Sequence, residues 1–156
     1  MIRLEIPGRG IFEFENVVLD LNGTLSVDGK IHPKARDKIN LLAKRAKTYV
    51  LTADTRGGAG QILRKLKAEI VMLSGDDTSQ EKAKFIKSIG PDRTVGIGNG
   101  YNDRLMVRNA ALGICVIGKE GASAETVKNA DVILPDVVDA LDFLLMPLRN
   151  KATLRR

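Results

Sequence analysis

Polar residues that could do chemistry stand next to short apolar runs at several points of this sequence. Asp20 directly follows the first of these runs, and Thr52 directly follows the second. Lys82 lies in the helical stretch after the third run, and the segment Gly98-Asn99-Gly100-Tyr101-Asn102-Asp103 follows the fourth. A carboxylate, a hydroxyl, an ammonium group and further oxygen donors suit phosphoryl transfer. That reaction needs a nucleophile, donors for the phosphoryl oxygens and a Mg²⁺ held by oxygen ligands. The set therefore points to phosphoryl-transfer chemistry.

Each residue taken alone also has an ordinary structural explanation. Asp20 could cap or close a loop, Thr52 could bond to backbone at the end of a strand, and Lys82 could be a solvated helix residue. The segment from Gly98 to Asp103 is more specific. Two glycines around an asparagine at a strand-to-helix junction form a tight turn that suits anions and hydrated cations. The interpretation rests on the whole set in this order.

The elements that must position these residues alternate along the chain. Short apolar runs bounded by turn residues predict buried strands, and stretches with helical spacing lie between them. This alternation predicts an α/β fold, a three-layer Rossmann-like parallel sheet with helices on both faces, in which ligands bind at the carboxyl ends of the strands. Two strand-like segments around Pro7-Gly8-Arg9-Gly10 predict an N-terminal β-hairpin. Strands are expected at 17–19, 48–51, 70–73, 94–97, 112–117 and 132–134, and helices at 33–47, 61–66, 79–89, 103–110, 122–129 and 137–145.

Length and composition favour a single domain over residues 1–156. The chain is 44% apolar and 28% charged, and a domain of this size needs no disulfide or structural metal. Cys115 is the one cysteine and stands in an apolar stretch, so we expect a buried inert thiol. The longest apolar run, 110–117, is too short to span a membrane, and the N-terminus lacks the pattern of a secretory signal. We therefore expect no membrane partner and a cytoplasmic location.

The positive charge of the chain points to an anionic partner. The net charge is +6, which could serve a nucleic acid, a membrane surface or a phosphorylated substrate. Nucleic acid ranks low because the sequence has neither interleaved aromatic residues nor a recognition motif. The basic tail at 149–156 is expected to be a solvated end.

The segments DLNGTL, LTADTRG, EKAKFI and IGNGYND, in this order and spacing, resemble the haloacid dehalogenase superfamily of phosphohydrolases. Within it, they are most similar to the small soluble proteins related to the phosphorylation domain of P-type ATPases. The resemblance covers nearly the whole chain. It implies a Mg²⁺-dependent phosphatase that acts on a phosphomonoester through an aspartyl-phosphate intermediate.

The resemblance also implies roles for individual residues. Asp20 would be the nucleophile and a metal ligand, and the backbone carbonyl of Asn22 would be a second ligand. Asn99 and Asp103 would face the Mg²⁺, directly or through water.

Other residues would act on the phosphate and the substrate. Thr52 would hydrogen-bond a phosphoryl oxygen, Asn102 would help to hold the phosphate, and Lys82 would neutralise charge on Asp20 and the phosphoryl group. Near these motifs, Arg56, Tyr101 and Arg104 could contact the rest of a large substrate. Asp54 is expected to bond backbone or Lys82 rather than to be catalytic.

Two departures from the commonest family pattern affect these expectations. Asn22 stands where most of the phosphatases have an aspartate that acts as acid and base, and an amide can do neither. Asn99 stands where an aspartate usually ligates Mg²⁺, so the metal should bind more weakly. We therefore expect slow turnover. The alternative is a catalytically weak or inactive module of the same fold that binds a phosphorylated ligand and has a regulatory role.

The spacing of the motifs leaves no room for the cap domain that many of these phosphatases carry. One helix and one or two short strands use up each of the gaps from Asp20 to Thr52 and from Thr52 to Lys82. The site should therefore be open. Either a second copy of the chain covers it, as in the capless octulosonate phosphate phosphatases that this architecture also resembles, or the substrate is itself large.

Overall fold

A six-stranded parallel sheet forms the centre of the protein. The structure is a computed structural model that describes residues 1–53, 60 and 63–156. The strand order is β10-β9-β8-β3-β6-β7, and each neighbouring pair runs parallel. All six strands expected from the apolar runs are present. They are β3 (Asn16–Asp20), β6 (Lys47–Thr52), β7 (Glu69–Met72), β8 (Thr94–Gly98), β9 (Leu112–Val116) and β10 (Val132–Leu134).

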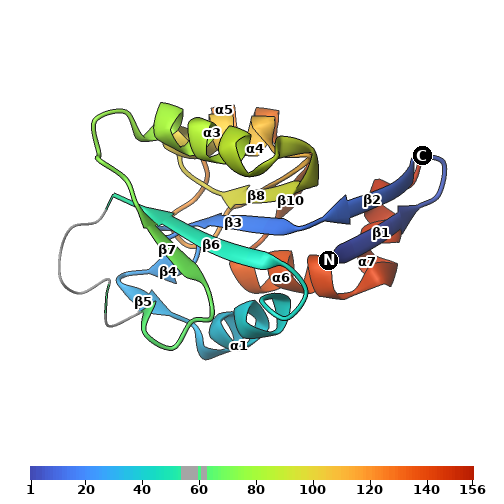
Figure 1. Cartoon of the computed structure of the whole chain (residues 1–156), viewed down its shortest axis with the longest axis horizontal. Helices are drawn as coiled ribbons and strands as arrows, with labels where there is room; N and C mark the ends of the chain where they lie inside the picture. Colours follow the sequence, from blue (N-terminus) through green and yellow to red (C-terminus); the bar gives the residue numbers. More distant parts are fainter. Residues whose placement is uncertain (54–59, 61–62) are drawn as a thin grey trace.

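Helices cover both faces of this sheet, which confirms the expected three-layer α/β fold. Figure 1 shows α3 (Thr78–Ile89), α4 (Arg104–Asn109) and α5 (Ala124–Asn129) on one face, with α1 (Pro33–Leu42) and α6 (Val137–Leu145) on the other. Two short 3₁₀ helices, η1 (Pro91–Arg93) and η2 (Tyr101–Asp103), flank β8. No helix in the described ranges is long and apolar enough to span a membrane.

The pleat of β3 decides which way Asp20 points. All five residues of this strand are buried. Val17 and Leu19 belong to the larger core, which also holds Ile39 of α1 and residues of α6, whereas Val18 packs with Ile86 of α3 in a second core. Successive side chains of a strand point to opposite faces, so Asp20 shares the face of Val18. The nucleophile candidate is therefore directed toward α3.

The N-terminal hairpin and the C-terminal helix lie together at one end of the molecule (Figure 1). Strands β1 (Ile2–Ile6) and β2 (Gly10–Phe14) pair antiparallel, which confirms the expected hairpin. The backbone N–H of Arg156 donates to the carbonyl of Pro7 at 3.0 Å. The tail is more ordered than a solvated end, because α7 (Pro147–Leu154) is a helix with Asn150 and Leu154 buried.

Two further local details differ from the sequence expectations. Helix α1 ends at Leu42 instead of 47, because the chain turns at 43–46 and the N–H of Lys47 then donates to the carbonyl of Glu15 as β6 begins. A small antiparallel hairpin, β4 (Ser26–Val27) and β5 (Lys30–Ile31), precedes α1. The helix expected at 61–66 lies partly outside the described residues. Cys115 is fully buried in β9, as expected.

Candidate active site

A pocket of about 760 Å³ opens where the strands β3, β6 and β8 end. Asp20 and Thr52 are the last residues of β3 and β6, and Asn99 follows β8 directly. Of the seven residues with expected roles in catalysis, phosphate binding or metal binding, six line this pocket: Asp20, Asn22, Thr52, Lys82, Asn99 and Asn102. The seventh, Asp103, lies behind the lining and is fully buried.

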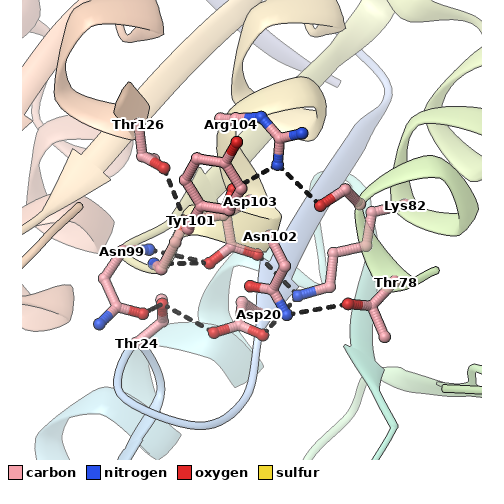
Figure 2. A network of polar contacts seen from close by, with 12 residues as sticks. Asp20, Thr24, Thr78, Lys82, Asn99, Tyr101, Asn102, Asp103, Arg104 and Thr126 are labelled. Atoms are coloured by element: carbon pink, nitrogen blue, oxygen red, sulfur yellow. Dashed lines mark hydrogen bonds and ion pairs between the residues drawn. The ribbon is translucent and has the colours of Figure 1, made fainter. Parts of the chain in front are cut away.

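Lys82 joins two carboxylates at the base of the pocket (Figure 2). Its Nζ donates to Asp20 Oδ1 at 2.8 Å and to Asp103 Oδ1 at 2.7 Å. The three side chains are almost completely buried. Helix α3 brings Lys82 here because Lys82 lies on the buried face of the helix with Ser79, Ala83 and Ile86. Buried charges at such short distances interact much more strongly than surface pairs.

Asp103 uses both of its oxygens on protein donors. Oδ1 accepts from Lys82, and Oδ2 accepts from the backbone N–H groups of Asn99 and Gly100, both at 3.0 Å. A Cβ on Gly98 would lie 2.5 Å from the Asp103 side chain, so the carboxylate occupies the space that glycine leaves. In this structure Asp103 fixes the turn after β8 and orients Lys82. Its expected place beside a metal remains a prediction.

Thr24 connects Asp20 to Asn99. Its Oγ1 lies 3.2 Å from Asp20 Oδ2 and 3.0 Å from Asn99 Oδ1. A hydroxyl has one proton and cannot donate to both oxygens at once. Asn99 is held in this orientation because its Nδ2 donates to the carbonyl of Gly121 at 3.0 Å. Sequence reasoning missed Thr24, although it belongs to the DLNGTL segment that carries Asp20.

The donors around this point fit a hard divalent cation. The Asp20 carboxylate and the Asn99 amide oxygen share one hydroxyl donor, and Asn22 lines the same pocket. Mg²⁺ prefers such oxygen ligands. Within the described part of the chain, no group of three or more His, Cys, Asp and Glu side chains is placed to hold a metal. A cation here would therefore depend on amide and backbone oxygens as well as on Asp20.

The buried cluster changes the acidity of its members. Burial, followed by the charge of Asp103, raises the pKa of Asp20 to about 7, against the lowering effects of Lys82 and Thr24. Burial lowers the pKa of Lys82, but the two neighbouring carboxylates outweigh this and the net shift is upward. Lys82 therefore stays a cation across the physiological range.

The remaining residues of the set lie around the rim. Asn102 Nδ2 donates to Thr78 Oγ1 at 3.1 Å, at the start of α3. The guanidinium of Arg104 donates to Ser79 Oγ at 2.9 Å and stacks 3.9 Å from the ring centroid of Tyr101 (Figure 2). Neither Tyr101 nor Arg104 is part of the pocket lining. The expectations for Asp54 and Arg56 fall outside the described residues.

The fold is shared with solved structures of phosphatases. The 3-deoxy-D-manno-octulosonate 8-phosphate phosphatase from Moraxella catarrhalis, solved with magnesium, phosphate and KDO, superposes with a TM-score of 0.72 and 16% identity, covering 90% of this chain and 91% of that one. A Legionella pneumophila protein described as a haloacid dehalogenase superfamily hydrolase of subfamily III A also gives 0.72 and 16%, covering 90% and 86%. The chain has the haloacid dehalogenase fold. A cobalt-bound phosphatase of the octulosonate type from Haemophilus influenzae shares this fold at a TM-score of 0.71 and 14% identity, covering 90% and 91%.

Sequence relatives add a family and two more distant likenesses. The chain matches no family model. It is 49% identical over 71 residues to an uncharacterized protein of Methanocaldococcus jannaschii, covering 45% of this chain and 76% of that protein. The chain belongs to the same family as this archaeal protein. It is also 28% identical over 131 residues to an Arabidopsis thaliana protein described as a probable copper-transporting ATPase, covering 79% of this chain and 13% of that protein. A phosphoserine phosphatase of Archaeoglobus fulgidus is 34% identical over 61 residues, covering 39% and 18%.

Proposed function

We propose that this protein is a Mg²⁺-dependent phosphatase that hydrolyses phosphomonoesters through an aspartyl-phosphate on Asp20. The observation that carries the proposal is the Asp20 carboxylate in the pocket, 2.8 Å from the Lys82 ammonium. The haloacid dehalogenase fold and the phosphatases that share it support the same chemistry. The likeness to an ATPase agrees with the proposed P-type ATPase-like subgroup.

In the proposed mechanism, an oxygen of Asp20 attacks the phosphorus, and the bond from phosphorus to the ester oxygen breaks. The leaving oxygen takes up a proton from solvent water. A second water then attacks the phosphorus of the aspartyl-phosphate, the bond from phosphorus to Asp20 breaks, and phosphate and a proton are released to solvent. Lys82 offsets the negative charge on Asp20 and on the phosphoryl group. Thr52 and Asn102 donate to phosphoryl oxygens. Since Asp103 holds the Lys82 ammonium from behind, it positions Lys82 without touching substrate.

Asp20, the carbonyl of Asn22 and the amide oxygen of Asn99 would hold the metal. A bound Mg²⁺ would supply positive charge that reduces the repulsion between the anionic nucleophile and the phosphoryl group. Asn22 offers no acid or base, and general acid–base catalysis contributes about 10²–10⁴-fold. We therefore expect slow turnover with ordinary esters and faster turnover with leaving groups that need no protonation.

The amides at positions 22 and 99 favour a second candidate function. A haloacid dehalogenase fold without these carboxylates could bind a phosphorylated ligand and release it unchanged, as a regulatory module does. This candidate predicts binding of Mg²⁺ and phosphate without turnover. The phosphatase proposal predicts turnover that requires Asp20.

The decisive experiment is the hydrolysis of p-nitrophenyl phosphate, whose leaving group needs no acid. Removing the nucleophile in Asp20→Asn should lower kcat by roughly 10³-fold or more. Asp37→Asn is the matched control, because Asp37 is an exposed aspartate of α1. After acid quenching, the wild-type protein should also carry a base-labile acyl phosphate. Equal activity in Asp20→Asn would contradict the mechanism, and binding of phosphate with no hydrolysis of any monoester would favour the regulatory module.

We also propose that the substrate is either large or enclosed by a second copy of the chain. Between β3 and β6 the structure holds only the hairpin of β4 and β5 and helix α1, which supports a site without an inserted cap. The phosphate could belong to a small molecule or to a macromolecule. A screen for hydrolysis of phosphorylated metabolites and phosphopeptides, together with a measurement of the oligomeric state, separates these possibilities.

A further inference from the structure

Three loops meet on the metal side of the proposed site. Strands β9, β8 and β3 are neighbours in the sheet, so the loops that follow them emerge side by side. Gly23 of the first loop has a φ of +81°. A Cβ built on it would lie 2.7 Å from Asn99 Nδ2 and 3.0 Å from Glu120 Oε2. The Glu120 carboxylate therefore lies beside Asn99, the position at which an amide stands where the family usually has an aspartate.

The loop that carries Glu120 is tied to Asn99. Asn99 Nδ2 donates to the carbonyl of Gly121 at 3.0 Å, and the N–H of Ser123 donates to the carbonyl of Asn99 at 2.8 Å. The first of these bonds turns the Asn99 amide oxygen toward Thr24 and Asp20. The contacts that direct Asn99 into the site thus also hold Glu120 next to it.

Glu120 is available for a ligand. Three carboxylates line the pocket in the described ranges: Asp20, Asp28 and Glu120. Asp28 has a structural role, since it forms the turn between β4 and β5 at a φ of +52°. Glu120 is exposed, and among the described residues it has neither an ion pair nor a hydrogen bond. Its oxygen faces the pocket without a partner in that part of the chain.

We propose that Glu120 supplies the carboxylate that Asn99 lacks, and that it holds the divalent cation, directly or through one water, together with Asp20 and Asn99. The inference rests on the proposed function, because it places a metal at this edge of the sheet. Carboxylates add most to the affinity of an oxygen site for a divalent cation. In this arrangement the second carboxylate of the site comes from the loop after β9 and not from the loop after β8.

The test measures metal affinity in the absence of substrate. Electron paramagnetic resonance during a Mn²⁺ titration measures the concentrations of free and bound Mn²⁺. Competition with Mg²⁺ then measures the affinity of the same site for Mg²⁺. Glu120→Gln should weaken Mn²⁺ binding by about 10- to 100-fold, the range found when groups that support a metal are removed. Asn99→Asp in the Glu120→Gln background should restore most of the loss, because it returns the carboxylate to the other loop.

Two control variants separate ligation from general electrostatics. Asp28→Asn removes one charge from the same pocket, and Glu125→Gln removes one from the exposed start of α5. Both should bind Mn²⁺ within roughly twofold of wild type. An equal loss in Asp28→Asn, or unchanged affinity in Glu120→Gln, would overturn the role of Glu120. If the wild-type protein binds no Mn²⁺ or Mg²⁺, the metal dependence in the proposed function fails as well. Since Glu120 is exposed, its variant should keep the wild-type melting temperature.

Discussion

Lys82 links the stability of the protein to its proposed chemistry. A cation between two buried carboxylates favours their charged forms against the effect of burial. Removal of one member of a buried ion pair leaves an uncompensated charge, which costs about 3–5 kcal/mol. Lys82, which is proposed to neutralise the phosphoryl group, therefore also stabilises the fold when no phosphoryl group is bound.

The variant Lys82→Met tests this link. Because two carboxylates would lose their counter-charge, we expect the free energy of unfolding to fall by about 3 kcal/mol or more. Urea denaturation monitored by circular dichroism measures it. Lys84→Met is the matched control, since Lys84 is exposed on the same helix. Adding Asp103→Asn to Lys82→Met should recover part of the loss, and equal stability of the two lysine variants would contradict the argument.

The sequence indicated the principal polar residues, but not how they contact one another. Asp20 was predictable because it directly follows an apolar run, and the end of a strand in a parallel sheet is where ligands bind. Thr24 was missed because its importance arises from Asn99, which is distant in the sequence. The role proposed for Glu120 could not be inferred from the sequence, because an exposed charged residue in a loop is indistinguishable from solvated surface until the loops are placed together.

At the scale of elements, the backbone at the end of β8 lies close to the side chain of Asp103 and helps to orient it. The absent side chain of Gly98 makes room for the Asp103 carboxylate, which in turn holds Lys82. The strand, the turn after it and helix α3 thus depend on one another at this point.

A substitution in β8 should show this dependence. In Gly98→Ala the new Cβ would lie 2.5 Å from the Asp103 side chain, so we expect a loss of about 1–3 kcal/mol and a fall in kcat as the carboxylate is displaced. Gly96→Ala, two residues earlier in the strand, meets its nearest atoms at 3.2 Å and should keep its activity with a smaller loss of stability. Denaturation and p-nitrophenyl phosphate kinetics compare the two. Equal activity of both variants would contradict the proposed role of the turn.

Most elements could be predicted from apolar periodicity, and the errors occur where periodicity is uninformative. The run before Asp20 is apolar throughout because both faces of β3 are covered. The end of α1 was placed too late, since Ala46 is buried at helical spacing from Leu42 although the chain has already left the helix. Each strand of the β4–β5 hairpin has two residues, too few for an alternating pattern.

For the whole molecule, the hairpin and α7 stabilise the end opposite the pocket. β2 leads into the amino end of β3, whereas Asp20 stands at its carboxyl end, as Figure 1 allows the reader to follow. Leu154 of α7 is buried in the core, and Leu148 of the same helix is 82% exposed. We therefore expect substitutions at this end to change stability without changing the proposed chemistry.

The two leucines provide a matched pair for this separation. Leu154→Ala should lower the free energy of unfolding by about 2–5 kcal/mol, because it leaves a cavity in the core. Leu148→Ala should change it by less than about 0.5 kcal/mol. Both variants should keep the wild-type kcat at temperatures where they are folded, as measured by calorimetry and by kinetics. A strong loss of kcat in folded Leu154→Ala would show that the two ends of the sheet are coupled.

Cys115 is a natural chemical probe of the stability differences between these variants, and it needs no introduced label. The thiol is fully buried in β9, and burial, with a smaller contribution from the charge of Asp103, raises its pKa to about 11. Alkylation requires an accessible thiolate. Because the thiol is buried and its pKa is raised, at neutral pH a reagent reacts with it only when the sheet opens. The rate of alkylation therefore measures the population of opened molecules, and any ligand that binds the folded protein slows that rate in proportion to its occupancy.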